Sequence, residues 1–172
     1  IMQRIDSLSK EKTFQFSEIK LTQFYGIELD DFAHEVAMLS LWLAEHQMNL
    51  EFYKAFGRTS PSLPLQNGGN IVHGNATRLN WEEVCPKNDG DEIYILGNPP
   101  YLGSSRQSKE QKEDMNFLFQ NFTNYKSLDY IACWFFKGAE YIKNINAKCS
   151  FVSTNSIAQG EQVSILWPNI LG

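Results

Sequence analysis

The sequence predicts an α/β domain with three layers, in which helices cover both faces of a largely parallel sheet. Three observations lead to this fold class. Short apolar runs of strand length alternate with segments whose apolar residues have helical spacing. One run, Glu92–Gly97, is almost continuously apolar, as a strand covered on both faces should be. Hydrophobic residues make up 42% and aromatic residues 13% of the 172 residues, which is enough to build a core.

The first elements expected along the chain are a short helix, a strand and a long helix. Apolar residues recur on one helical face in Ile1–Lys12, and Gln23–Leu29 has the apolar centre of a buried strand. Aspartate often caps helices, so Asp30 predicts the start of a helix whose apolar residues continue from Phe32. Because its apolar face is wide, we expect protein on both sides of this helix. Glycine, proline, serine and asparagine dominate Gly57–Asn70, which indicates a loop.

The second half continues the alternation of strands and helices. Its expected elements are a strand at Ile71–His73, a turn at Trp81–Glu83, the strand Glu92–Gly97, a loop or exposed helix at Ser104–Asp114, a helix at Leu128–Ile142 and a strand at Phe151–Ser153. Asp129 and Lys143 lie near the ends of the expected helix with the charges that its dipole favours.

The charge balance argues against a freestanding nucleic-acid-binding module. The chain has 20 Asp and Glu residues against 15 Lys and Arg residues, which gives a net charge of −5. A module that binds nucleic acid by itself usually carries a basic surface. Any function on DNA therefore requires a basic surface in parts of a protein beyond this chain.

The cysteines and the apolar runs exclude several other classes. Cys85, Cys133 and Cys149 are far apart and form no CxxC pair, so we expect no disulfide framework and no metal site, and a reducing cytoplasm fits best. The longest apolar run, Ala132–Phe136, is far shorter than the roughly 20 residues that span a bilayer, so no membrane partner is expected.

Polar residues follow the expected strands at the edge where an open parallel sheet binds ligands. These residues are Glu28, Asn75, Asn98–Tyr101 and Thr154–Asn155. A carboxylate in the position of Glu28 can accept hydrogen bonds from both hydroxyls of a ribose, as in nucleotide-binding α/β folds. The alternative is that Glu28 caps or solvates its own loop.

Asn98-Pro99-Pro100-Tyr101 is the sharpest signal in the chain. Two consecutive prolines remove backbone donors and restrict φ, so the turn is stiff and its carbonyl oxygens are free to accept hydrogen bonds. If the Asn98 side-chain oxygen and the Pro99 carbonyl each accept one N–H of an exocyclic amine, the nitrogen lone pair is withdrawn from its ring. Tyr101 offers a flat face on which a base can stack. The alternative is a rigid loop without a ligand.

These residues resemble those of the class I S-adenosylmethionine-dependent DNA methyltransferases that modify the N6 amino group of adenine. Gly97–Tyr101 is similar to their catalytic motif, and Phe24–Asp30 is similar to the strand whose acid, here Glu28, holds the cofactor ribose. Gly74-Asn75-Ala76 resembles the loop that binds the cofactor adenine, although the family commonly has Asp at the position of Asn75. Phe151–Ser156 and Gln159–Gln162 resemble the strand and helix that follow.

The resemblance implies a Rossmann-like methyltransferase sheet and a set of site residues. Asn98, Pro99, Pro100 and Tyr101 would be catalytic, and Glu28, Asn75, Ala76 and Asn98 would bind S-adenosylmethionine. The tail and the long helix look most like large single-chain type II restriction-modification proteins. The implied function is methyl transfer to adenine in double-stranded DNA, as part of a restriction-modification system.

The chain lacks the family's Gly-rich first motif, because no Gly-x-Gly occurs in it. We therefore interpret residues 1–172 as a partial catalytic domain that begins with the helix after that motif, Ile1–Lys12, and lacks the central strand and the later target-recognition region. Residues 98–114 would form the catalytic loop and its following segment. The isolated chain is expected to be inactive, with its open strand edges paired by another segment or by a second copy in a homo-oligomer.

Three points are left open by the residues themselves. The motif accepts any planar amine, so a protein glutamine or an RNA base is an alternative substrate. The chain could also be a non-catalytic remnant scaffold, whereas a dehydrogenase is disfavoured by the absence of a Gly-rich dinucleotide turn. Arg106, Lys109 and Lys112 could contact DNA phosphates, but the acids interleaved with them favour a solvated helix.

Overall fold

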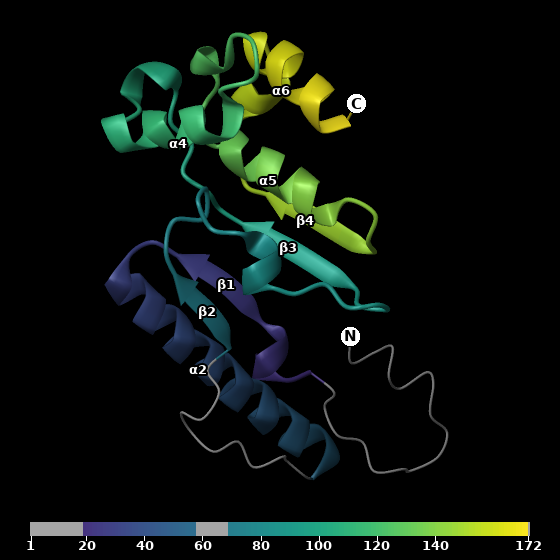
Figure 1. Cartoon of the computed structure of the whole chain (residues 1–172). Helices are drawn as coiled ribbons and strands as arrows, with labels where there is room; N and C mark the ends of the chain where they lie inside the picture. The colour runs from purple at the N-terminus through teal and green to yellow at the C-terminus, as the bar shows by residue number, and fades with distance from the viewer. Residues whose placement is uncertain (1–18, 58–68, 172) are drawn as a thin grey trace. The chain divides into compact units, whose positions relative to one another are not determined.

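The computed structural model describes residues 19–57 and 69–171, which fall into two compact units that meet in sequence between His73 and Gly74 (Figure 1). The helix expected at Ile1–Lys12 lies outside the described residues, as does most of the loop expected at Gly57–Asn70.

The first unit is a pair of parallel strands with one long helix. Its elements are the 3-10 turn η1 (Leu21–Gln23), strand β1 (Tyr25–Glu28), helix α2 (Asp31–Phe56) and strand β2 (Asn70–His73). β1 and β2 are parallel, with Tyr25 opposite Asn70 and Glu28 opposite His73. The predicted strand begins two residues too early, because Leu21–Gln23 closes a turn in which the Phe24 N–H donates to the Leu21 carbonyl.

Helix α2 begins and ends at residues that suit its termini. The Asp30 carboxylate accepts a hydrogen bond from the Ala33 N–H (2.8 Å), which confirms the predicted N-cap. Gly57 ends the helix with φ of 70°, a left-handed conformation that glycine adopts without a Cβ clash.

The first unit buries little of its apolar surface. No described residue of β1 or α2 is fully buried, and Tyr25, Phe32 and Leu39 are 43%, 78% and 51% exposed. The expectation that Gln23–Leu29 is a buried strand is therefore wrong for the described chain. The physical reason is that the first unit has a single described helix: α2 packs on the β1 and β2 pair, and no second described helix of this unit covers the strands.

The second unit contains the remaining strands and helices. They are α3 (Trp81–Val84), β3 (Ile93–Gly97), η2 (Ser104–Arg106), α4 (Lys109–Phe119), η3 (Tyr125–Ser127), α5 (Ala132–Ile142), β4 (Ala147–Phe151), η4 (Asn155–Ala158) and α6 (Glu161–Leu171). β3 and β4 are parallel, with Ile93 opposite Ala147 and Gly97 opposite Phe151.

Helix α5 joins this sheet to a hydrophobic core. In Figure 1, α5 runs alongside β4 and β3, and α4 and α6 lie beyond it. The core is centred on the fully buried Ile131 and Cys133, with Phe119 from α4 and Leu166 from α6. Gly138 lets α5 approach β4 closely, since a Cβ there would lie 2.9 Å from the sulfur of Cys149.

Several boundaries differ from the predictions in this unit. The helix expected from Leu128 begins at Ala132, because the preceding residues form the turn η3 and an extended link. The last strand is Ala147–Phe151 and not Phe151–Ser153. The segment expected to be a loop or exposed helix contains α4, and its Asp114 is buried.

Strand β3 has only one covered face in the described chain, which corrects the expectation of two. Its residues alternate between half-buried and exposed, and Tyr94 and Leu96 are 57% and 79% exposed. The reason is that, within the second unit, α5 packs on one face of the β3 and β4 pair and no described helix of this unit packs on the other face.

Both strand pairs are parallel and both carry helices, which confirms the predicted α/β class. Among residues 19–57 and 69–171, no third strand pairs with either sheet. That another segment or a second copy completes the sheet stays a prediction. No helix within these ranges is long and apolar enough to cross a membrane.

Candidate functional site

The Asn98–Tyr101 loop leaves the end of β3 at a point of close contact with β4. The Val152 N–H donates to the Gly97 carbonyl oxygen (2.9 Å) and extends the strand pairing up to the loop. A Cβ on Gly97 would lie 3.2 Å from the Phe151 ring, which is tighter than ordinary packing. Glycine at this position therefore lets the loop begin directly against β4.

The four residues of the loop divide into a buried anchor and an exposed surface. Pro99 is buried, whereas Asn98 and Pro100 are exposed and Tyr101 is 48% exposed. In the described part of the chain, no group hydrogen-bonds to the Asn98 carboxamide. An exposed, unpaired amide on a stiff backbone is available to a ligand.

The far end of the loop is fixed by backbone and side-chain hydrogen bonds to the Leu102 carbonyl oxygen. The Tyr130 N–H donates to it (2.8 Å), and so does the Gln107 amide (3.3 Å), which also donates to the Leu128 carbonyl (2.9 Å). Gln107 is buried. The loop is thus held at both ends, which reduces the ordering needed when a ligand binds.

The segment after β4 is fixed near the beginning of α5. The Ser156 hydroxyl donates to the Asp129 carboxylate (2.7 Å), and the Asp129 N–H donates to the Gln162 side-chain oxygen (3.0 Å). Besides lying near the start of α5, where an acid suits the helix dipole, Asp129 therefore ties the residues after β4 to this helix.

Asn75 and Ala76 form a turn whose side-chain hydrogen bonds point inward. The Asn75 Oδ1 accepts from the Thr77 N–H (2.9 Å) and from the Thr77 hydroxyl (2.8 Å). Its Nδ2 donates to Asp114 Oδ2 (2.9 Å), and the Ala76 carbonyl accepts from the Trp81 indole N–H (2.9 Å). Thr77 is almost fully buried, so the turn is a rigid part of the second unit.

Asp114 is the centre of this network and was missed by the sequence analysis. Its side chain is 7% exposed and accepts hydrogen bonds from Arg78 Nε and from the Tyr130 hydroxyl, both at 2.6 Å. Burial alone would raise the pKa of Asp114, but hydrogen bonds from Tyr130, Asn75 and Arg78 outweigh it and lower the pKa. The carboxylate therefore stays charged inside the protein.

A sequence signal for the burial of Asp114 was available. Asp114 and Met115 precede Leu118 and Phe119 by four residues each, so they share one face of α4 with two apolar side chains. An acid on the apolar face of a helix indicates a buried partner, but it does not say which one.

Glu28 lies at the end of β1, opposite His73 in the first unit. Its Oε1 accepts from the Leu29 N–H (2.9 Å) and the Asp30 N–H (3.1 Å), so the carboxylate caps the following turn. The His73 Nε2–H donates to the Leu29 carbonyl (2.9 Å) and holds this turn beside the end of β2. No donor among the described residues reaches Oε2, which leaves that oxygen open to a ligand.

The predicted site residues are divided between the units. Asn75, Ala76 and Asn98–Tyr101 belong to the second unit, and Glu28 belongs to the first. That they form one site stays a prediction. In the described ranges, no group of three or more His, Cys, Asp or Glu residues could hold a metal ion.

The basic residues after the loop behave as solvated side chains. Lys109 is 87% exposed, and its ammonium lies 3.9 Å from Glu113, which is 61% exposed. Arg106 and Lys112 are also exposed. The structure agrees with the interpretation of this face as a solvated helix.

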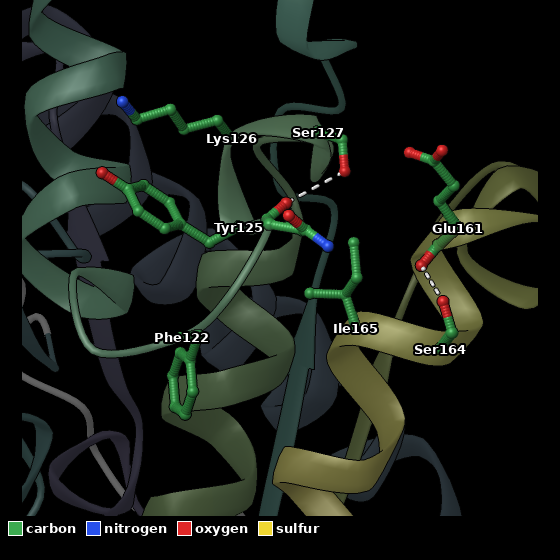
Figure 2. A pocket seen from close by; sticks show the side chains of 8 residues that line it. Phe122, Tyr125, Lys126, Ser127, Glu161, Ser164 and Ile165 are labelled. Atoms are coloured by element: carbon green, nitrogen blue, oxygen red, sulfur yellow. Dashed lines mark hydrogen bonds between the residues drawn. The ribbon is translucent and has the colours of Figure 1, made fainter.

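A hollow of about 650 Å³ lies between η3 and α6 and contains none of the predicted site residues (Figure 2). It is lined by Phe122, Asn124, Tyr125, Lys126, Ser127, Glu161, Ser164 and Ile165. The hydroxyls of Ser127 and Ser164 donate to backbone carbonyls of their own turns, those of Asn124 and Glu161. The charged side chains of its lining, Lys126 and Glu161, belong to opposite sides of the hollow, and neither is a predicted site residue.

Parallel α/β pairing together with a stiff Asn-Pro-Pro-Tyr loop at a strand end defines a domain of the Rossmann-like methyltransferase class. The comparison with known proteins is more specific. The family described as "MmeI, DNA-methyltransferase domain" matches residues 1–172, and the chain belongs to this family.

Two relatives extend well beyond the length of this chain. DNA methyltransferase A of Bacillus subtilis (strain 168) is 53% identical over 168 residues, which cover 97% of this chain and 19% of that protein. The solved structure of the Type IIL restriction-modification enzyme MmeI in complex with DNA matches with a TM-score of 0.80 and 42% identity, covering 90% of this chain and 21% of the MmeI chain. The chain thus spans about a fifth of each.

Proposed function

We propose that this chain is the partial catalytic domain of an S-adenosylmethionine-dependent DNA methyltransferase that modifies the N6 amino group of adenine within a restriction-modification system. The observation that carries the proposal is the exposed, unpaired Asn98 amide on a loop anchored at Gly97 and Leu102. Membership in the MmeI methyltransferase family and the DNA-bound relative support it.

In the proposed reaction, the target adenine is flipped out of double-stranded DNA and stacks on Tyr101. The Asn98 Oδ1 and the Pro99 carbonyl each accept one N–H of the amino group, which turns the nitrogen lone pair toward the methyl donor. The rigidity of the loop supplies the alignment on which most of the rate depends. The methylated nitrogen then loses its proton to water, so the site needs no general base.

The residues at the strand ends fit the proposed cofactor. Glu28 has a free carboxylate oxygen for the ribose hydroxyls, the turn at Asn75 and Ala76 would hold the adenine, and Asn98 would lie beside the methyl group. When bound, S-adenosylmethionine supplies the methyl group as a sulfonium electrophile.

The longer protein would supply what this chain does not. Because the chain has a net charge of −5, we place the basic DNA-binding surface in other parts of the protein. We also propose that a further segment or a second copy pairs with the open strand edges, that the isolated chain is inactive, and that the protein works in the cytoplasm, which suits its free cysteines.

Asn98→Ala in the full-length protein that contains this chain tests the catalytic assignment. Methyl transfer to DNA should fall by about a hundredfold to a thousandfold, because removing one group aimed at the reacting atoms typically costs this much. Binding of S-adenosylmethionine, measured by calorimetry, should change little. The control is Asn121→Ala, at an exposed position without a role in the site. Near-normal turnover of Asn98→Ala would refute the assignment.

Substrate assays separate the alternatives. Methyl transfer from labelled S-adenosylmethionine is measured with DNA, RNA and a glutamine-containing protein, and only DNA should be modified, at adenine N6. Transfer to RNA or protein alone would replace the proposed substrate. Tight S-adenosylmethionine binding by the 172 residues alone would contradict the expectation that the isolated chain is inactive.

A further inference from the structure

Asn75 is held between two partners of opposite hydrogen-bonding character. Its Oδ1 accepts from the N–H and the hydroxyl of Thr77, and its Nδ2 donates to Asp114 at 2.9 Å. A backbone N–H can only donate and an ionised carboxylate can only accept. These neighbours therefore allow one orientation of the Asn75 amide, and both lone pairs of its oxygen are in use.

Asp114 is fixed just as tightly on its other sides. Arg78 and Tyr130 each donate to it at 2.6 Å, and its side chain is 7% exposed. The pair Asn75 and Asp114 joins the turn after β2 to α4, and Tyr130 extends the link toward α5. The same Tyr130 donates its N–H to Leu102 at the end of the catalytic loop.

An aspartate at position 75 would be incompatible with this arrangement. It would replace the Nδ2 donor by a carboxylate oxygen against the buried Asp114, and two carboxylates in contact repel each other. The network therefore favours an amide over a carboxylate at position 75.

We propose that Asn75 and Asp114 are one coupled pair that positions the cofactor-binding turn, with Asp114 as a positioning residue. Asn75 acts on the cofactor through the shape of the turn at Ala76 and not through its side-chain oxygen, which Thr77 occupies. This inference rests on the proposed function for the identity of the ligand, whereas the coupling of the pair rests on the hydrogen bonds alone.

A reciprocal exchange of the two side chains tests the pair. Asn75→Asp, Asp114→Asn and the double variant are made in the full-length protein, with Asn121→Asp and Asp89→Asn as exposed controls. In the double variant, the amide introduced on α4 can donate to the carboxylate introduced in the turn, so the contact is rebuilt with reversed polarity. The measurements are kcat, KM for S-adenosylmethionine, its calorimetric Kd and the melting temperature.

We expect Asn75→Asp to raise KM and Kd for S-adenosylmethionine by about tenfold or more, with a smaller change in kcat, as for loss of a buried polar contact. Asp114→Asn should have a smaller effect in the same direction. The double variant should recover at least about threefold of the loss seen in Asn75→Asp, because the rebuilt contact removes the repulsion between two carboxylates, although the amide on α4 no longer accepts from both Arg78 and Tyr130. If Asn75→Asp does not fold, Tyr130→Phe serves instead, because it removes one hydrogen bond to Asp114. This variant should raise the KM for S-adenosylmethionine and leave kcat unchanged.

The outcomes separate this inference from the proposed function. Additive losses in the double variant would overturn the coupled pair. Compensation in the melting temperature without compensation in Kd for S-adenosylmethionine would overturn the positioning role. If the wild type and both controls transfer no methyl group to DNA, the proposed function fails, and the melting temperatures still decide whether the pair is coupled.

Discussion

The two units differ in what holds them together. All fully buried residues of the described chain belong to the second unit, where Phe119, Ile131 and Leu166 form a continuous core. The first unit has none, and its long helix exposes Phe32 and Leu39. The second unit therefore contains the apolar burial that stabilises a fold, whereas the first depends on surfaces that the described residues do not provide.

Polar groups show the same difference. The second unit satisfies its buried Asp114 with three donors. In the first unit, the indole N–H of Trp42 is buried and has no acceptor among the described residues, although its ring stacks on His46 at 5.8 Å. A buried donor without a partner costs free energy, so the first unit is expected to gain stability if further protein supplies an acceptor for Trp42.

The largest expected effect contrasts a core phenylalanine with an exposed one. Phe119→Ala should reduce the free energy of unfolding of the chain by about 3–5 kcal/mol, because it leaves a cavity at a side chain that is 1% exposed. Phe32→Ala, at 78% exposure, should change it by less than about 0.5 kcal/mol. Urea unfolding measures both. Equal losses would show that the core is not confined to the second unit.

Much of this contrast could not be read from the sequence. Three features follow from local patterns, because each depends on neighbouring residues. They are the Asp30 cap, the strand that ends at His73 and the position of the Asn98 loop. The exposure of Leu96 does not follow from a local pattern. An apolar strand indicates that a layer covers it, but it does not show which segment or chain supplies that layer.

The buried network was beyond reach of the sequence for a related reason. Asp114 bonds to Asn75 and Arg78 across 39 and 36 residues, and no periodicity links such distant positions. The Asn98–Tyr101 loop could be recognised because its residues are adjacent in the sequence. The turn that is proposed to bind the cofactor could be recognised only in part, because its geometry depends on a carboxylate from another helix.

Acid should act on the second unit through Asp114. Its pKa is lowered in the folded state, so its contribution to stability is complete above the unfolded pKa of about 3.9 and is lost as the pH falls through the folded pKa. Asp114→Asn should cost about 1.5–3 kcal/mol at neutral pH, as for hydrogen bonds to a charged group, and should flatten the fall in melting temperature below about pH 4. Melting curves recorded across this range check both. If the melting temperature of the variant falls with decreasing pH as steeply as that of the wild type, a group other than Asp114 causes the loss of stability in acid.

The smallest effect is expected at the exposed face of the same helix that carries Asp114. Lys109 and Glu113 are 87% and 61% exposed and 3.9 Å apart, and solvent screens such pairs strongly. Lys109→Ala should therefore leave the melting temperature and the KM for DNA within error of the wild type, in contrast to Asp114→Asn further along the same helix. A clear rise in the KM for DNA, growing weaker as salt is added, would instead assign Lys109 to a phosphate contact and make this face of α4 part of the DNA-binding surface.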